Sequence, residues 1–180
     1  MSVIVVIKNK DSFDIGADAR ASGDYAYYDF KEEPFKLLKL DNGIVIGICG
    51  DPGISEIARK VFSVCEDFDE ELLRQKYIFN LRQTLINLNQ DDLKYELVVA
   101  YKDSAFVIYD GGGVNKIHNV MALGSGRESA LGYLYGNLGS SINKKELVKE
   151  AVRVSSKIVH SVSSCGWYIN TNELVFEAFE

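Results

Sequence analysis

Few residues of the kinds that build zinc sites, disulfide frameworks or flexible linkers occur in this sequence. Among 180 residues there are two histidines, three cysteines and two prolines. The two histidines, His118 and His160, give little support for a Ser-His-Asp triad or a histidine-based zinc site. Cys49, Cys65 and Cys165 are odd in number and lack C-x-x-C spacing, so we expect reduced thiols rather than disulfides. We expect neither a metal nor a cofactor.

The chain also lacks the features of nucleic-acid-binding, membrane and multidomain proteins. Its formal net charge is -6, which argues against nucleic acid and anionic membranes as partners. No apolar run approaches the roughly 18 residues of a membrane span, and the apolar run at 3–7 is too short for a signal peptide. Nothing in the composition marks a linker. We therefore expect one globular domain over residues 1–180, in the cytoplasm.

Apolar residues make up 47% of the sequence, and their spacing predicts an alternation of strands and helices. Strands are expected at 2–7, 12–18, 35–40, 44–49, 95–101, 104–110, 120–123, 167–169 and 174–179, and helices at 54–65, 70–89, 128–135 and 144–162. The first strand is apolar on both faces, as in a strand that is buried on each side. Two sheets, each covered by a helical layer, bury this order economically, with the second sheet following the first helices.

Two segments each allow two interpretations. Residues 22–33 read as an irregular or hairpin loop, whose tyrosines Tyr25, Tyr27 and Tyr28 could contact a substrate or a neighbouring subunit. Ordinary packing at a sheet edge, with exposed hydroxyls, is the other interpretation. The acidic run at 66–71 is interpreted as a solvated loop and helix start rather than a metal site, because carboxylates suit a helix N-terminus.

Ser2 is a candidate nucleophile because of its place in the chain. Removal of Met1, which a small second residue permits, would leave Ser2 with both its hydroxyl and the α-amine of the chain. An α-amine titrates near ~8, so it can act as the base that takes the proton of the hydroxyl. The alternative is that a serine after the initiator methionine, which is common, has no catalytic meaning.

A lysine and an aspartate are expected beside this terminus. Alternation in the strand at 35–40 places Lys36 on one face with Leu38 and Leu40. A buried ammonium needs a partner, and a cation beside the α-amine would favour the neutral, basic amine. Asp18, at the end of the strand at 12–18, is the expected partner. Taken separately, Asp18 could be a turn residue and Lys36 a solvated lysine at a strand end.

Several short motifs, taken together and in order, resemble a known family. After Ser2 they are G-A-D-A-R-A-S at 16–22, K-L-L-K-L at 36–40, G-I-C-G-D at 47–51 and A-L-G-S-G at 122–126. The set, which extends from Ser2 to about Gly166, resembles proteasome β-subunits and the bacterial HslV peptidase, which are N-terminal-nucleophile (Ntn) hydrolases. The resemblance implies an α/β (α+β) fold, a four-layer α/β/β/α sandwich of two mainly antiparallel sheets. The absence of a helix before the first strand matches the β-type subunit.

The resemblance also implies roles for five residues. Ser2 matches the catalytic N-terminal threonine, Asp18 the conserved acid, and Lys36 the lysine that tunes the amine. Gly50 matches the glycine whose N–H helps to form the oxyanion hole, and it precedes a change from strand to helix where N–H groups point outward. Ser125 matches a serine that supports the terminus. Without the resemblance, Ser125 could equally be a turn serine that caps the next helix.

The resemblance further implies that Ala21 and Ile48 line an apolar specificity pocket. The sequence departs from the family in three respects: the nucleophile is serine rather than threonine, the spacing between the acid and the lysine is longer, and one acid is missing. That late acid, in a pattern D-x-x-S-G, would fall at Val162, with Cys165 and Gly166 after it.

The sequence thus predicts a proteasome-like or HslV-like peptidase that cleaves peptides or unfolded proteins with Ser2 as nucleophile and its α-amine as general base. The resemblance implies a closed homo-oligomeric ring and an ATPase cap as partner. Two alternatives remain open. One is an Ntn amidohydrolase that acts on a small amide. The other is a noncatalytic ring or assembly subunit, which the residue Val162 favours.

Overall fold

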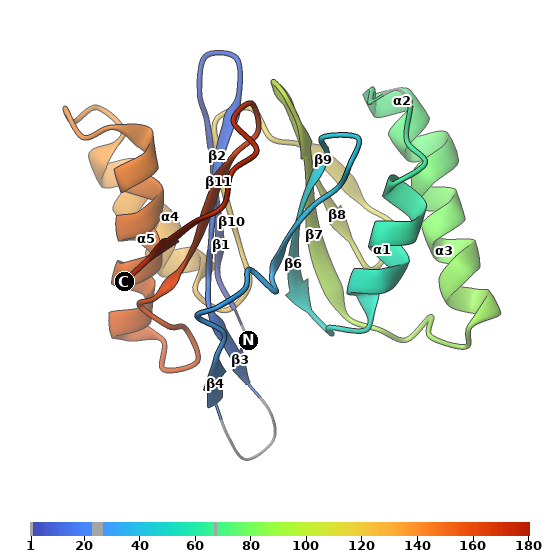
Figure 1. The fold of residues 1–180 in the computed structure, drawn as a ribbon, viewed down its shortest axis with the longest axis horizontal. Helices are drawn as coiled ribbons and strands as arrows, with labels where there is room; N and C mark the ends of the chain where they lie inside the picture. The colour runs from blue at the N-terminus through green and yellow to red at the C-terminus, as the bar shows by residue number, and fades with distance from the viewer. Residues whose placement is uncertain (1, 23–26, 67) are drawn as a thin grey trace.

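The computed structural model describes residues 2–22, 27–66 and 68–180, and most of its strands belong to two five-stranded sheets (Figure 1). The first sheet has the order β10 (Val120–Leu123), β1 (Ile4–Lys8), β2 (Phe13–Asp18), β11 (Gly166–Asn170) and β12 (Glu177–Phe179). The second has the order β5 (Leu37–Lys39), β6 (Val45–Gly50), β7 (Tyr95–Tyr101), β8 (Ser104–Tyr109) and β9 (Val114–Lys116). Neighbouring strands in both sheets are antiparallel.

Helices cover the outer face of each sheet (Figure 1). α4 (Arg127–Asn137) and α5 (Lys144–Ile158) pack on the first sheet. On the second sheet lie α1 (Ile54–Phe62) and a longer helical stretch made of α2 (Glu70–Leu72), the π-helical turn η1 (Leu73–Tyr77) and α3 (Ile78–Asn87). The predicted four-layer α/β/β/α sandwich of antiparallel sheets is confirmed.

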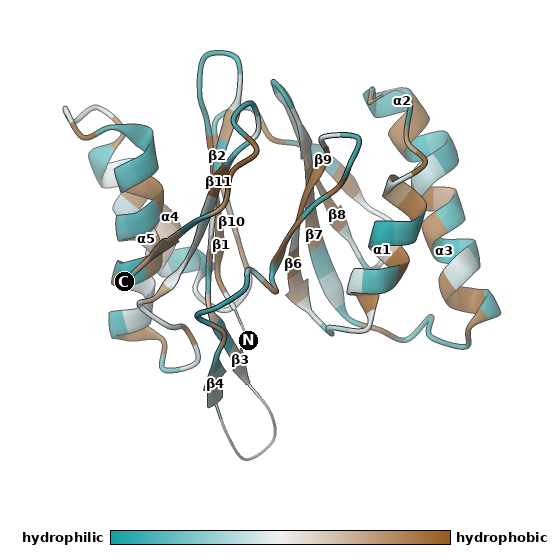
Figure 2. Cartoon of the chain, in the orientation of Figure 1, coloured by the Kyte–Doolittle hydropathy of each residue, from teal (hydrophilic) through white to brown (hydrophobic). Residues whose placement is uncertain are grey.

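Three buried apolar clusters fill the spaces between the four layers. The segment 3–7, which includes most of β1, contributes to two of them: Val3, Val5 and Ile7 face the helices α4 and α5, while Ile4 and Val6 face the second sheet. All five side chains are fully buried, as the two-faced apolar pattern predicts. In Figure 2, by contrast, α1, α3 and α5 carry both hydrophobic and hydrophilic residues, which is typical of helices with one solvent-exposed face.

The helix α5 begins as predicted and ends earlier. The side chain of Asn143 accepts a hydrogen bond from the Glu146 N–H at 2.9 Å, which caps the first turn. The helix ends at Ile158 rather than at residue 162, because Val159 already has extended backbone angles. β-branched residues and serines, which are poor helix formers, dominate this end of the helix. Val162 nevertheless packs in the cluster between the helices and the first sheet.

The expected membership of the sheets is wrong. β5 and β6 precede the first helices, yet they pair with β7 and β8, whereas β10, β11 and β12 join β1 and β2. The short strand β9 was also not predicted. Strands with two apolar faces have no sequence feature that selects a partner, so pairing between distant segments depends on how the whole chain packs.

The segment after β2 forms a two-stranded ribbon, the hairpin interpretation of residues 22–33. β3 (Arg20–Ser22) pairs with β4 (Tyr27–Asp29), and the ribbon projects from the sandwich beside the N-terminus (Figure 1). Tyr27 and Tyr28 are 53% and 62% exposed. Tyr25 lies outside the described residues.

The acidic run caps a helix. Asp69 accepts hydrogen bonds from the N–H groups of Glu71 and Leu72 at 2.8 and 3.0 Å, at the start of α2, while Asp67 lies outside the described residues. Across residues 2–22, 27–66 and 68–180, we find no group of three or more acidic, histidine or cysteine side chains placed to hold a metal ion. Within the same ranges no helix has the length and apolar character needed to span a bilayer.

Gly16 of β2 lies against Val148 of α5, and we expect Gly16→Ala to destabilise the protein. An added Cβ would lie 2.4 Å from Cγ1 of Val148, and overpacking of this kind costs about 1–3 kcal/mol. Gly132→Ala in α4, where a Cβ meets nothing within 4 Å, should instead stabilise the helix by about 0.5–1 kcal/mol. Urea unfolding measures both changes, and a shift in the same direction for both variants would contradict the prediction.

Candidate active site

The predicted catalytic residues meet at one edge of the sandwich, where β1 begins and β2, β6 and β10 end. In Figure 1 this is the edge that carries the N-terminus and the ribbon β3–β4. Ser2 lies two residues before the start of β1 and is 5% exposed. Antiparallel pairing explains the convergence, because Ile4 lies opposite both Ala17 and Leu123, near the ends of β2 and β10.

Lys36 and Asp18 form a buried ion pair. Lys36 Nζ donates to Asp18 Oδ1 at 2.7 Å, and their side chains are 5% and 0% exposed. The alternative interpretations of Asp18 as a turn residue and of Lys36 as a solvated lysine are therefore wrong. Two charged groups that are buried this deeply require good geometry and further hydrogen bonds to offset the cost of their desolvation.

The carboxylate of Asp18 receives those further bonds from the main chain. Its Oδ1 also accepts from Val3 N–H at 2.8 Å, and its Oδ2 accepts from the N–H groups of Arg20 and Ser163 at 3.1 and 3.2 Å. Val3 directly follows the candidate nucleophile in the chain. The ion pair is thus hydrogen-bonded to the peptide unit next to Ser2.

Lys36 reaches Asp18 from a turn rather than from within a strand. The Leu37 N–H donates to the Pro34 carbonyl at 3.1 Å, and β5 begins only at Leu37, two residues after the predicted start at 35. The Lys36 carbonyl accepts from the Ile48 N–H at 2.9 Å. This bond fixes the main chain of Lys36 against β6.

A loop after β10, residues 124–126, contacts the main chain of Ser2 through hydrogen bonds and close packing. The Ser2 carbonyl accepts from the Gly126 N–H at 3.2 Å and from Ser125 Oγ at 3.3 Å. A Cβ on Gly124 would lie 2.2 Å from the Ser2 carbonyl oxygen, and the φ of Gly124 is +81°. Both the left-handed backbone and the close approach require glycine at position 124. The structure thus brings Ser125 to Ser2, as predicted.

Gly50 ends β6 with its N–H directed away from β7. The Asp51 N–H donates to Lys94 on the β7 side at 2.8 Å, whereas the Ile48 N–H donates to Lys36 on the β5 side. Backbone N–H groups alternate between the two edges of a strand, so the Gly50 N–H points to the same side as that of Ile48. Gly50 and Lys36 both line a cavity that adjoins Ser2.

Two cavities adjoin Ser2, and Gly50 lines both. The first has a volume of about 240 Å³ and contains both predicted specificity residues, Ala21 and Ile48, together with the ring of Phe35. The second, of about 400 Å³, is lined by charged and aromatic side chains: Lys94, Tyr95, Glu96, Tyr109, Asp110 and Arg127. An extended chain lying past Ser2 would find a cavity on either side, each with both polar and apolar lining residues.

Cys49 lines the second cavity beside Ser2, but its thiol is not a competing nucleophile. Burial raises the pKa of the Cys49 thiol to about 12, and the nearby Lys36 ammonium offsets this only in part. Because the thiolate is the reactive form of cysteine, a thiol with so high a pKa is inert near neutral pH. In the part of the chain that the structure describes, no disulfide joins Cys49, Cys65 or Cys165.

Sequence reasoning missed two serines between α5 and β11. Ser161 is 3% exposed, and its Oγ lies 3.4 Å from Ser125 Oγ, while Ser163 donates its N–H to Asp18. The family pattern placed an acid at Val162, whose side chain points into the apolar core instead. The sequence feature that could have indicated these serines is their clustering just after the amphipathic helix. They were overlooked because the helix was predicted to extend to residue 162.

Ser163 also ties the ribbon β3–β4 to the site. Its hydroxyl donates to Asp29 at 3.2 Å, and Arg20 binds the same carboxylate through two nitrogens at 2.8 and 3.0 Å. The hydrogen bond from Arg20 holds the pKa of Asp29 below its usual value. The stability that this Arg20–Asp29 contact adds is therefore fully present at pH values above the ordinary pKa of an aspartate. It is lost as the pH falls through the lowered pKa of Asp29.

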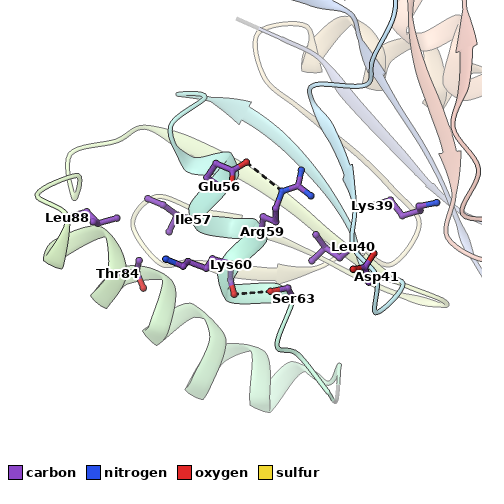
Figure 3. A pocket seen from close by; sticks show the side chains of 10 residues that line it. All are labelled: Lys39, Leu40, Asp41, Glu56, Ile57, Arg59, Lys60, Ser63, Thr84 and Leu88. Atoms are coloured by element: carbon purple, nitrogen blue, oxygen red, sulfur yellow. Dashed lines mark hydrogen bonds and ion pairs between the residues drawn. The ribbon is translucent and has the colours of Figure 1, made fainter.

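A third cavity, of about 540 Å³, lies away from this edge and has no lining residue in common with the other two. Figure 3 shows it between α1, α3 and the turn before β6, with Glu56 and Arg59 paired at 3.6 Å on its wall. None of the predicted site residues lies there.

Comparison with solved structures finds close similarity in fold. BPH from Thiobacillus denitrificans in complex with epoxomicin superposes with a TM-score of 0.76 at 13% identity, over 93% of this chain and 97% of that one. Eukaryotic HslV from Trypanosoma brucei gives 0.75 at 16% identity, over 93% and 98%. This protein has the HslV-like Ntn fold. No protein-family model and no curated protein matches the sequence.

The HslV-like fold confirms the resemblance drawn from the motifs, and the similarity in fold covers more of the chain than the motifs do. A second structure of Thiobacillus denitrificans BPH has a TM-score of 0.75 at 14% identity, over 93% of this chain and 96% of that one. The similarity therefore covers nearly the whole chain, although fewer than one residue in five is identical. The structural neighbours are HslV-type and proteasome-type peptidases.

Proposed function

We propose that this protein is an HslV-like peptidase that uses Ser2 as an N-terminal nucleophile after removal of Met1. The observation that carries this proposal is the buried Lys36–Asp18 pair, hydrogen-bonded to the peptide N–H that follows Ser2. A buried ion pair gives little net stability compared with apolar packing. Its position beside a hydroxyl that lines two cavities therefore supports a chemical role.

The first half of the proposed reaction forms an ester. Ser2 Oγ attacks the carbonyl carbon of a peptide bond while the α-amine of Ser2, directly or through a water, takes the hydroxyl proton. The positive charge of Lys36 favours the neutral amine that this step requires. The Gly50 N–H stabilises the oxyanion of the tetrahedral intermediate. The C–N bond then breaks, and the leaving amine takes the proton from the α-ammonium.

The second half releases the product. A water attacks the ester carbonyl and gives its proton to the α-amine, and the same oxyanion donor stabilises the second tetrahedral intermediate. The C–O bond to Ser2 breaks, Ser2 Oγ recovers the proton, and a carboxylic acid leaves. Ser125, which contacts the Ser2 carbonyl, would hold the main chain of the nucleophile in place through both steps.

The substrate is proposed to be a peptide or unfolded protein. The part of the first cavity that is lined by Ala21, Ile48 and Phe35 suits an apolar side chain next to the cleaved bond. We further propose a homo-oligomeric ring of single-domain chains in the cytoplasm, with an ATPase cap as partner. The likeness to HslV supports this assembly.

The test is the intact mass of the protein, alone and after exposure to a peptide epoxyketone. This reagent bridges the hydroxyl and the α-amine of one N-terminal residue, and BPH of Thiobacillus denitrificans has a structure with epoxomicin. We expect loss of Met1 and one adduct on Ser2 per chain. Ser2→Ala, which keeps the amine and removes the hydroxyl, is the control and should form no adduct.

The same samples separate the proposal from its two alternatives. A native mass spectrum with a multiple of the chain mass supports the ring, whereas a monomer that hydrolyses small amides would identify an Ntn amidohydrolase. Retained Met1, or a free Ser2 that does not react, would identify a noncatalytic subunit. The substitution of the late acid favours this last alternative, since the segment 161–166 contains no carboxylate.

A further inference from the structure

Glu96, a residue of the second sheet, contacts loop 124–126, which binds the main chain of Ser2. Glu96 lies on β7 opposite Cys49 of β6, whose side chain belongs to the apolar cluster between the two sheets. Directly opposed residues of a sheet share a face, so Glu96 points toward the first sheet. It stands at the sandwich edge that carries the candidate site, and its side chain is 21% exposed.

The carboxylate of Glu96 holds both ends of a short segment after β10. Its Oε2 accepts from the Gly124 N–H at 2.9 Å, and its Oε1 accepts from Arg127 Nη1 at 3.1 Å. Hydrogen bonds from a main-chain N–H to a carboxylate are stronger than those between neutral groups. The ion pair with Arg127 is half exposed and so contributes little energy, but it orients the carboxylate toward Gly124.

Between those two contacts lie the groups that touch Ser2. Ser125 Oγ and the Gly126 N–H both donate to the Ser2 carbonyl, and Gly124 packs so closely on that carbonyl that a Cβ has no room. The contacts form a continuous path from Glu96 through Gly124 to Ser2. A shift of the loop away from the second sheet would move the donors to Ser2 with it.

We propose that Glu96 is a positioning residue that fixes loop 124–126 and, through it, the main chain of Ser2 and the hydroxyl of Ser125. The catalytic part of this inference rests on the proposed function. Glu96 has no chemical step of its own. Its carboxylate joins loop 124–126, which follows a strand of the first sheet, to β7 of the second sheet. The main chain of Ser2 is therefore held in place by contacts from both sheets.

The test compares Glu96→Ala and Glu96→Gln with the wild-type protein. Misplacement of a reacting group by about 1 Å costs about 10²-fold in rate, so Glu96→Ala should slow epoxyketone addition to Ser2 by about that factor. For peptide substrates the loss should appear in kcat with little change in KM. Glu96→Gln keeps an oxygen that can accept from the Gly124 N–H and should recover most of the rate.

A matched control removes a glutamate that is paired elsewhere on the fold. Glu177 on β12 binds Lys145 and Lys149 of α5, away from the site, and Glu177→Ala should leave the rate of epoxyketone addition unchanged. Equal losses in Glu96→Ala and Glu177→Ala would overturn the proposal, since they would indicate general destabilisation. A normal rate in Glu96→Ala would overturn it as well.

A second readout does not depend on activity. Hydrogen exchange at the amides of residues 124–126 should be faster in Glu96→Ala than in wild type, while exchange within α5 stays the same. Faster exchange in a protein whose Ser2 never reacts would support the positioning of the loop and refute the proposed peptidase function. Unchanged exchange in the loop would refute the positioning role, whatever the activity.

Discussion

Lys36→Ala should lower kcat/KM for peptide hydrolysis by about 10³-fold, within the range that general acid–base catalysis contributes. The reason is that, in the proposed mechanism, the Lys36 ammonium, 2.7 Å from Asp18 Oδ1, favours the neutral, proton-accepting amine, and removal of its charge removes this influence. Asp18→Asn should produce a similar loss, because the lysine then loses the anion that holds it. Initial rates with a fluorogenic peptide measure both effects.

Stability must be measured alongside activity in these variants. Breaking a buried ion pair costs about 3–5 kcal/mol, although in Lys36→Ala three main-chain N–H groups still bind the Asp18 carboxylate. We expect native circular dichroism at room temperature and a lower Tm. The control is Lys39→Ala, which removes a lysine of β5 whose side chain binds an exposed carbonyl, and it should keep wild-type activity. Near-normal activity in Lys36→Ala or Asp18→Asn would show that this division of roles is wrong.

Gly124→Ala should abolish reaction at Ser2 and destabilise the fold. Its added Cβ would meet the Ser2 carbonyl oxygen at 2.2 Å, the Ser2 carbonyl carbon at 2.8 Å and Cys49 Sγ at 3.1 Å. The first two contacts involve backbone that forms part of the site, so relief of the overlap requires movement of Ser2 or of the loop. We expect no epoxyketone adduct in the intact mass and a lower midpoint of urea unfolding.

Gly43→Ala separates the cost of the backbone angle from that of the overlap. Gly43 has φ +85°, close to the +81° of Gly124, but its Cβ would only meet the ring of Tyr101 at 3.3 Å and Leu174 at 3.6 Å. A left-handed alanine costs about 1–2 kcal/mol, so this variant should be less stable and fully reactive. If Gly43→Ala lost reactivity to the same degree, the effect of Gly124→Ala would not depend on contact with Ser2.

Local features of the fold could be predicted from the sequence, and distant pairings could not. The hairpin of β1 and β2 and the start of α5 at Lys144 follow from alternation, turn residues and a cap that lie within a few positions of one another. The pairing of β6 with β7 joins segments separated by two helical stretches, α1 and the stretch α2–η1–α3. Since β6 is apolar on both faces, its pattern does not distinguish β7 from β1 as a partner.

The same division applies to the candidate site. Ser2, Asp18, Lys36 and Ser125 could be selected because each stands at the end of a predicted strand or in a motif that resembles the family. Ser161 could not be selected, because the helix predicted up to residue 162 ends at Ile158. Beyond that point helical spacing no longer tells whether residue 161 or residue 162 faces Ser125, and in the structure it is Ser161. Glu96 was missed because its partner lies in the other sheet.

The position of β2 between β1 and β11 has a consequence for protein synthesis. Asp18 lies opposite Gly166, and its carboxylate is completed by an N–H group from residue 163. While that segment is still inside the ribosome, β2 lacks one neighbouring strand and the first sheet cannot close, because such long-range pairing forms late. A nascent chain would thus carry Ser2 before the segment at residues 163–166 has joined Asp18. Under the proposed function, the order in which the strands emerge would keep Ser2 inactive until synthesis is nearly complete.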